Sequence, residues 1–415
     1  MKNKLFTKNF TLLVAGQASS LFGNCILDFA MSMYVLEVTG SAAVFAGFLA
    51  AAMLPAILLS PLAGVLADRA NKRSIMVALD FISGVVTLLA ALMMGRVSDL
   101  TVICTALIAL SVLGTFESPT VQACIPQMQT GDNIVRGNAV VNQIAAVSTL
   151  AAPFIGSMLY SSFGLKPVMY AGVICFFITS IFEYFIRLDY IPQQTNGHIL
   201  QIVKHDLKAS THFISRVRPS ILKTLLLVSV TAFFVQGVAL VGLPFIIRSV
   251  LGLSASYYGA AESILGFAGL AGSVIAGLAA ARFRTGNLNL PILCIGLFLL
   301  PAGLIFYIPI GTFPRYVTLI AFFALIQIAA CVFSIFCLSI IQQLTPERMI
   351  GKVMAYTATI SLCAQPLGQI IYGILFDVFS NNIYFVLLPS AVILCVTGLA
   401  AKHFFRKTEE QLKQH

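Results

Sequence analysis

Twelve long apolar runs constrain what this chain can fold into more than any other feature of its sequence. A helix needs about 20 mostly apolar residues to cross the hydrocarbon core of a bilayer. The strands of a membrane barrel would instead show segments of about 10 residues with alternating hydrophobicity. The runs cover residues 11–37, 42–67, 74–95, 101–125, 138–160, 167–187, 222–246, 257–281, 290–309, 315–341, 353–375 and 383–402. They predict an all-α polytopic membrane protein with twelve transmembrane helices.

The composition excludes the other broad classes of protein. Apolar residues make up 59% of the chain and charged residues 10%, whereas a soluble domain carries about 25% charged residues. Disorder would require low hydrophobicity together with high net charge. The net charge of +10 does not indicate a nucleic-acid partner, because the basic residues lie in the short gaps between apolar runs.

The one long polar stretch lies in the middle of the chain, with six apolar runs on each side. We therefore predict an N-terminal six-helix bundle over residues 1–187 and a C-terminal six-helix bundle over 222–402. Residues 188–221 would form a cytoplasmic central linker, and residues 403–415 a cytoplasmic tail.

The two halves also resemble each other. A shift of 213 positions superposes Gly64 on Gly277, Arg69 on Arg282 and Pro153 on Pro366. Two pseudo-symmetric bundles of this kind are typical of transporters, whose substrate site lies between the repeats near the membrane midplane.

The positions of lysine and arginine orient the spans. With a cytoplasmic N-terminus, 21 of the 25 basic residues fall on the cytoplasmic side, and only Arg96, Lys166, Arg248 and Arg315 fall outside. The positive-inside rule then places both termini in the cytoplasm of a multi-pass protein of the cell membrane. The linker carries His198, His205 and His212 at seven-residue spacing among basic residues. This pattern favours the solvated face of a surface helix on anionic lipid over a metal site or a pH sensor.

The short loop between the second and third runs reads G-V-L-A-D-R-A-N-K-R from Gly64 to Arg73. Gly64 allows a neighbouring helix to approach closely, and Asp68 can accept hydrogen bonds from the start of the next helix. Asn71 is expected to adopt the left-handed conformation that so short a loop needs. The basic residues of the loop anchor it on the cytoplasmic side.

This loop resembles the signature G-x-L-A-D-R-x-G-R-R of the major facilitator superfamily, with Asn71 in place of a glycine. In the second-half copy, Ala281 replaces the aspartate. The resemblance is closest to the twelve-span drug:proton antiporter branch, which includes macrolide-efflux proteins. Further residues that carry it are Gly16-Gln17, the turn Thr39-Gly40-Ser41, Asp80, Ser118-Pro119, Ile125-Pro126, Asn138, and Pro153 with Gly156.

The resemblance implies the major facilitator fold, in which this loop locks the halves together when the cytoplasmic side is closed. The implied gating residues are Gly64, Asp68, Arg69, Lys72 and Arg73. Asp80 lies near the inner end of the third run, and it would join this gate by pairing with one of the basic residues.

Four acidic residues lie well inside apolar runs: Asp28, Asp80, Glu117 and Glu262. An acid at the centre of a membrane helix costs at least about 2.5 kcal/mol, so each is a candidate for function by default. A buried acid without a cationic partner tends to hold a proton, as a proton carrier must. We predict proton coupling at Asp28, Glu117 and Glu262. The alternatives are a place at the membrane interface for Glu262 and pairing with the basic loop for Glu117.

The first span carries a polar stripe, because Gln17, Leu21, Asn24 and Asp28 recur at helical spacing. We predict that Asn24 and Asp28 face the substrate path. Polar contacts between packed helices are the alternative explanation of the stripe.

Amides mark the predicted walls of the substrate path in the second half, at Gln236, Gln327 and Gln365. Phenylalanines lie at similar depth in the same spans. Aromatic walls with a few polar groups suit a bulky amphipathic ligand.

These features favour a secondary active transporter that exports a hydrophobic or amphipathic small molecule, such as a drug, macrolide or siderophore, by alternating access driven by inward proton flow. A proton-coupled importer or uniporter of a small nutrient or metabolite is the rival hypothesis. An enzyme is disfavoured because the sequence has no nucleotide-binding loop, metal-ligand cluster or histidine within a span. No cofactor or metal is expected. The predicted partners are the substrate, protons and the lipid bilayer, and we expect a monomer.

Overall fold

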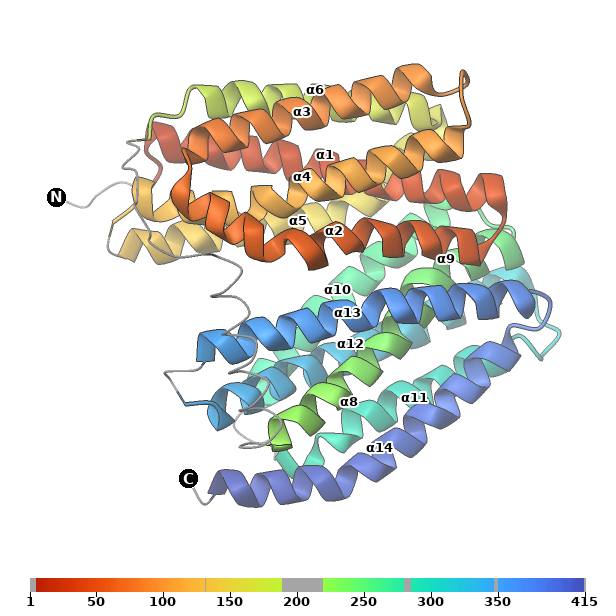
Figure 1. The fold of residues 1–415 in the computed structure, drawn as a ribbon. Helices are drawn as coiled ribbons and strands as arrows, with labels where there is room; N and C mark the ends of the chain where they lie inside the picture. The colour runs from red at the N-terminus through yellow and green to blue at the C-terminus, as the bar shows by residue number, and fades with distance from the viewer. Residues whose placement is uncertain (1–4, 131, 189–218, 280–284, 347–349, 414–415) are drawn as a thin grey trace. The chain divides into compact units, whose positions relative to one another are not determined.

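The computed structural model describes residues 5–130, 132–188, 219–279, 285–346 and 350–413 (Figure 1). Within these residues, twelve helices are long and apolar enough to cross a membrane. The predicted all-α class with twelve spans is confirmed. The elements are α1 (Lys8–Thr39), α2 (Ala42–Arg69), α3 (Lys72–Met93), α4 (Asp99–Met128), α5 (Asp132–Phe163), α6 (Leu165–Tyr184), α8 (Pro219–Val235), η2 (Gln236–Gly242), α9 (Leu243–Phe245), η3 (Ile246–Val250), α10 (Ala255–Ala279), η4 (Thr285–Asn287), α11 (Asn289–Leu304), α12 (Thr312–Leu344), α13 (Ile350–Val378) and α14 (Tyr384–Lys413).

Two helix ends differ clearly from the predicted runs. α14 continues to Lys413, well beyond residue 402, because the polar residues that follow the apolar run are mostly strong helix formers. α11 ends at Leu304 rather than at residue 309. Pro301 lacks an amide hydrogen and Gly303 has low helix propensity, so the last turns of this run leave the helix. Almost all of the predicted linker, with its three histidines, lies outside the described residues.

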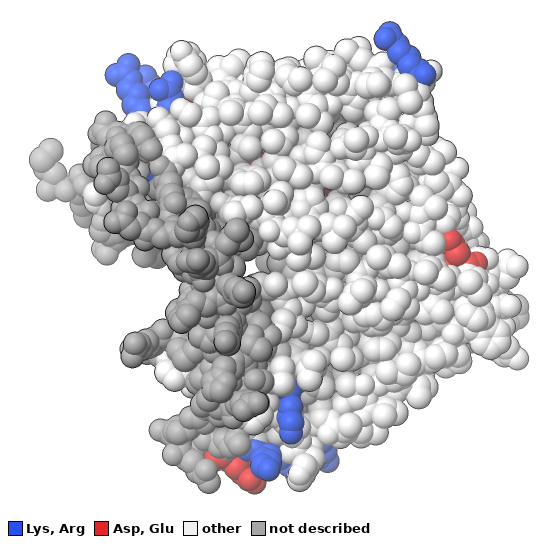
Figure 2. Space-filling model, in the orientation of Figure 1, with Lys and Arg blue, Asp and Glu red and all other residues white. Residues whose placement is uncertain are grey.

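Large apolar side chains point outward along the helices. Leu58 is 70% exposed, Leu278 77% and Leu399 62%. On the face shown in Figure 2 the described surface is mostly uncharged, with lysine and arginine near its edges. Soluble proteins rarely expose so much apolar surface, whereas lipid tails solvate it well. The chain is a multi-pass membrane protein.

The chain divides into two compact units. Unit 1 contains Met1–Val38, Ala51–Ile199 and Ala255–Ala260, and thus most of α1–α6. Unit 2 contains Thr39–Ala50, Leu200–Ser254 and Ala261–His415, and thus the later helices together with the first turns of α2. The predicted domain boundaries remain a prediction.

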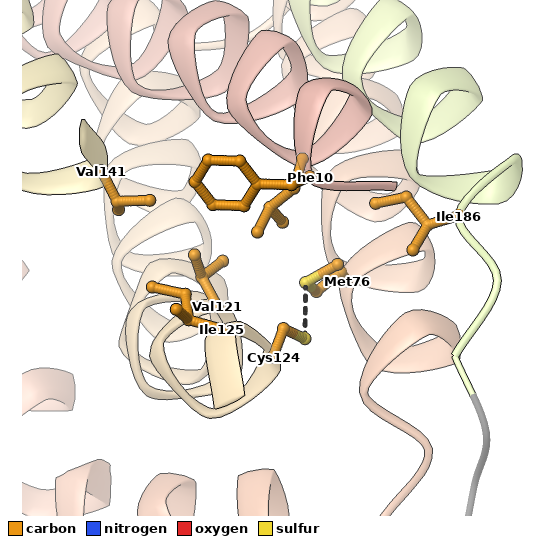
Figure 3. Packing of buried hydrophobic residues seen from close by; sticks show 8 residues of the cluster. Phe10, Met76, Val121, Cys124, Ile125, Val141 and Ile186 are labelled. Atoms are coloured by element: carbon orange, nitrogen blue, oxygen red, sulfur yellow. Dashed lines mark hydrogen bonds between the residues drawn. The ribbon is translucent and has the colours of Figure 1, made fainter. Parts of the chain in front are cut away.

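A cluster of buried apolar residues joins five segments of unit 1 (Figure 3). The thiol of Cys124 in α4 donates to the thioether of Met76 in α3 at 3.6 Å. Because lipid is as apolar as these side chains, close packing rather than hydrophobicity alone holds the helices together. The members of the cluster are Phe10, Leu13, Met76, Val121, Cys124, Ile125, Val141 and Ile186.

The seventh span in unit 2 is not a regular α-helix throughout. After α8 the chain passes through η2, α9 and η3. Pro244 has no amide hydrogen to donate, and π-type turns of this kind widen a helix locally. Gly237 and Gly242 lie directly against the rings of Tyr372 and Phe376 in α13. This close approach of α13 therefore depends on glycine in the seventh span.

The prediction of a left-handed conformation at Asn71 is wrong. Asn71 has φ −67° and ψ 104°, and it is the N-cap of α3. Its side-chain oxygen accepts a hydrogen bond from the amide of Ser74 at 3.3 Å. An N-cap residue favours this extended backbone because its side chain then reaches a free amide of the first turn. The loop is short because α3 begins immediately after this cap.

Replacing Asn71 by alanine should lower the stability of the protein by about 1 kcal/mol, because the side-chain cap is lost. Thermal unfolding of the purified protein in detergent would measure the change. Asn71→Asp retains the acceptor and should unfold like the wild type. An Asn71→Ala variant as stable as both would contradict the capping role.

Candidate functional site

Three carboxyl groups meet inside unit 1. Asp80 comes from α3, Glu117 from α4 and Glu183 from α6, and their side chains are 1%, 8% and 0% exposed. α3 packs along both α4 and α6, which explains how residues so far apart in sequence come together. Burying even one acid in a membrane protein is costly. A cluster of three therefore indicates a function beyond packing.

Two polar residues of α1 contact this carboxyl cluster, which we define as Asp80, Glu117 and Glu183. The hydroxyl of Ser20 lies 2.8 Å from Oδ1 of Asp80 and 3.2 Å from Oε1 of Glu117. The amide of Gln17 donates to the same Glu117 oxygen at 3.1 Å. A serine hydroxyl has a single proton, so Ser20 can donate to only one of the two acids at a time.

Small residues let α1 approach α6 closely enough for these contacts. A Cβ at Gly23 would lie 3.0 Å from Cβ of Cys175, and one at Gly16 would lie 3.3 Å from Thr179. The hydroxyl of Thr179 donates to the Gly16 carbonyl at 3.1 Å. The stripe of α1 thus faces the acidic interior of unit 1.

Asp80 and Glu183 face each other within hydrogen-bonding range. Among the described residues, no hydroxyl or N–H group donates to Oδ2 of Asp80 or to either oxygen of Glu183. The nearby Arg73 is engaged elsewhere, because its guanidinium donates to the Tyr184 carbonyl and lies 4.9 Å from the centre of the Tyr184 ring. Among the described residues, nothing supplies the hydrogen atom that a hydrogen bond between the two carboxyl groups would need.

The predicted polar stripe of α1 divides into a buried and an exposed part. Asn24 is half-buried, and its amide lies 3.5 Å from the Ser20 hydroxyl. Asp28, one helical turn further on, is exposed, whereas its neighbours Leu27 and Phe29 are buried. The stripe thus leads from the carboxyl cluster to an accessible acid.

The remaining predicted substrate and proton residues lie in unit 2. Gln236 in η2, Gln327 in α12 and Gln365 in α13 are all half-buried. Their roles in substrate binding stay predictions. Glu262 in α10 is half-buried as well. Unit 2 also contains a small apolar cavity lined by Phe234, Val238, Ile295, Leu299 and Phe323, among others.

The predicted gating residues are only partly described. The side chains of Gly64, Asp68 and Arg69 fall outside the described residues, and Lys72 and Arg73 are half-buried at the start of α3. Asp80 contacts Ser20, and no ion pair joins it to Lys72 or Arg73. The gating roles stay predictions.

Two acids with buried or hydrogen-bonded side chains, Glu183 and Asp377, are not among the residues predicted from sequence. Glu183 lies near the end of its apolar run, where an acid can reach the membrane surface. Its signal is the helical spacing of Gly172, Thr179, Ser180 and Glu183, which forms one small and polar face. In unit 2, Asp377 of α13 accepts hydrogen bonds from the Ala42 amide at 2.6 Å and the Ala43 amide at 3.1 Å, at the N-terminus of α2.

Comparisons with known proteins agree with the motif-based resemblance. The family model described as Major Facilitator Superfamily matches residues 13–361. Macrolide efflux protein A of Streptococcus pyogenes is 24% identical over 396 residues, which cover 93% of this chain and 94% of that protein.

Solved structures with this fold include a nucleoside transporter and a sugar-proton symporter. The nucleoside transporter NupG superposes with a TM-score of 0.70 at 15% identity, covering 95% of this chain and 99% of that one. A D-xylose-proton symporter superposes with a TM-score of 0.68 at 14% identity, covering 95% and 96%. At these identities the likeness shows the fold alone.

Proposed function

We propose that this chain, which belongs to the Major Facilitator Superfamily of membrane transporters, exports a hydrophobic or amphipathic small molecule in exchange for protons. The observation that carries the proton coupling is the carboxyl cluster, since three buried acids lack an ion pair with any described basic residue. Members of this family transport small molecules and are not enzymes.

Similarity to macrolide efflux protein A over nearly the whole chain supports export rather than import. Within this proposal, a macrolide or another neutral or cationic amphipathic compound is the substrate. Acidic and amide groups would orient it by hydrogen bonds while apolar side chains hold its bulk. The candidate residues are Asn24, Asp28, Gln236, Gln327 and Gln365. A role in multidrug resistance would follow from such a substrate range.

In the proposed cycle, the substrate site opens to each side of the membrane in turn. The loop from Gly64 to Arg73 would close the cytoplasmic side, with both termini and the central linker in the cytoplasm of the cell. Asp28, Glu117 and Glu262 are the candidates for moving the proton, and the transporter would act as a monomer.

Import of a nutrient is the rival function, because the fold is shared with a D-xylose-proton symporter and a nucleoside transporter. The two functions differ in the direction of flux relative to the proton gradient. An exporter accumulates substrate in the compartment that is more acidic, whereas a proton symporter moves substrate out of it.

The purified protein in proteoliposomes should therefore accumulate a radiolabelled macrolide when the lumen is acidic relative to the bath, and a protonophore should abolish this accumulation. Protein-free liposomes under the same gradient provide the control for passive partitioning of a weak base. Accumulation only with an alkaline lumen would support the importer, and flux that ignores the pH gradient would disprove proton coupling.

A further inference from the structure

We propose that Asp80 and Glu183 hold a single proton between them and that this pair is the site where the transported proton binds. The proposal deepens the proton-coupled transport proposed above and rests on it. It assigns Asp80 a role in the carboxyl cluster rather than in the cytoplasmic gate. It also adds Glu183, which the sequence candidates do not include.

Asp80 and Glu183 are buried, and most of their carboxyl oxygens have no hydrogen-bond partner among the described residues. Oδ2 of Asp80 and both oxygens of Glu183 are shielded from solvent and receive no hydrogen bond from any described donor. The side chains are 1% and 0% exposed. Buried polar atoms without partners are rare in folded proteins, and each one indicates a missing ligand or a special role. Here the unpartnered atoms belong to two groups that, when ionised, can only accept hydrogen bonds.

One shared proton gives each acid a hydrogen-bond partner in the other. Two ionised carboxylates side by side repel each other, and the repulsion is stronger inside a protein, where the dielectric constant is lower than in water. Addition of a proton forms one O–H bond on either carboxyl group, and that O–H then donates to the other carboxylate. The pair keeps one negative charge, and loss of the proton to the substrate path or to the cytoplasm restores the dianion.

No charged group that the structure describes around the pair neutralises the two acids in place of this proton. Glu117 of α4 adds a third acid, linked to Asp80 through the Ser20 hydroxyl. Cys124 of α4 and Lys72 of α3 are the other titratable groups nearby. Arg73 of α3 interacts with the carbonyl and the ring of Tyr184. In the described part of the chain, none of these cations forms an ion pair with the cluster.

Ser20 connects the pair to the rest of the polar stripe. Its hydroxyl lies within hydrogen-bonding distance of both Asp80 and Glu117. It can take a proton from one acid as it gives its own to the other. Asn24 contacts Ser20, and the exposed Asp28 follows one turn later. The polar stripe that contacts the buried pair therefore continues along the same helix to an accessible acid.

A small cation is the competing occupant of such an acidic site. Among the described residues, no group of three His, Cys, Asp or Glu side chains is arranged to hold a metal ion. The proton is the occupant that two facing carboxyl groups fit by themselves.

Glu183→Gln and Asp80→Asn test the proposal, with Glu37→Gln as the matched control. Glu37 lies at the exposed end of α1 and accepts a hydrogen bond from Tyr160, away from the cluster. Two measurements are made on full-length purified protein. The first is pH-difference infrared spectroscopy, in which a buried protonated carboxyl group has its own carbonyl band. The second is macrolide flux in proteoliposomes, both under a pH gradient and as exchange at equal pH.

We expect the wild type and Glu37→Gln to show the buried carboxyl band and pH-driven flux. Glu183→Gln and Asp80→Asn should each lose the band and the pH-driven flux but keep substrate exchange at equal pH. A purely structural role would lower both fluxes together. Should Glu183→Gln fail to fold, Glu183→Asp keeps a carboxyl group and should retain a shifted band.

The outcomes separate the two proposals. If wild-type flux ignores the pH gradient, the proposed proton coupling fails, whereas the infrared band still reports on the pair. If wild-type flux follows the pH gradient and Glu183→Gln retains both band and flux, the assignment of the pair is overturned while proton coupling stands. Absence of the band in the wild type, or flux driven by a sodium gradient at constant pH, also overturns the assignment.

Discussion

Replacing Gly368 in α13 by leucine should prevent unit 2 from reaching a stable fold. A Cβ atom at this position would overlap the backbone carbonyl of Phe233 in α8. A backbone carbonyl cannot move aside unless the two helices separate, and Gly237 already lies against Tyr372 at the same interface. Overpacking a core costs typically about 1–3 kcal/mol, and more when no side chain can yield. Folded yield by size-exclusion chromatography and the midpoint of thermal unfolding measure the loss.

Gly277→Leu is the matched control for this change. Gly277 is an exposed glycine of α10, also in unit 2, and a Cβ atom there would meet nothing within 4 Å. It should give a normal yield of folded protein. Gly368→Ala should fall between the wild type and Gly368→Leu. Equal yields for Gly368→Leu and Gly277→Leu would show that the contact between α8 and α13 is not the constraint inferred from the structure.

The spans could be predicted from sequence because the membrane limits the possible structures. Every buried backbone group must find its partner within a helix, and a helix must be long enough to cross the bilayer. The same rule does not reveal where a span departs from regular α-helix or where a helix continues beyond the membrane. The widening of the seventh span around Pro244 leaves the apolar run unbroken. The end of α14 was missed because polar residues that continue a helix look the same in sequence as a tail.

The candidate site could be predicted only in part. Asp80 and Glu117 are visible as acids within apolar runs, since a charge in lipid is costly. Their shared partner Ser20 is invisible in sequence, because serine is common in membrane helices and its role depends on which helices meet. Glu183 was missed for a related reason. An acid near the end of a run is usually solvated, and here it is buried because α3 packs along α6 and α1 approaches α6 at Gly16 and Gly23.

Replacing Asp28 by asparagine should strongly reduce proton-driven transport while leaving exchange of substrate at equal pH largely intact. Asp28 is the accessible acid at the end of the stripe that begins at the carboxyl cluster. An amide has nearly the shape of the acid but cannot bind and release a proton in this pH range. Macrolide flux in proteoliposomes, with and without a pH gradient, measures both effects. Undiminished pH-driven flux would remove Asp28 from the mechanism.

Comparing Asp28→Asn with Glu183→Gln shows whether the two acids act on one proton pathway. If Asp28 only passes protons to the buried pair, Asp28→Asn should keep the infrared band of the pair and slow its response to a pH jump. The double variant Asp28→Asn with Glu183→Gln should then be no worse than Glu183→Gln alone, because residues on one pathway show non-additive effects. Additive losses would mean that Asp28 moves a proton independently of the pair. In that case, the contact between Asn24 and Ser20 would only hold α1 in place.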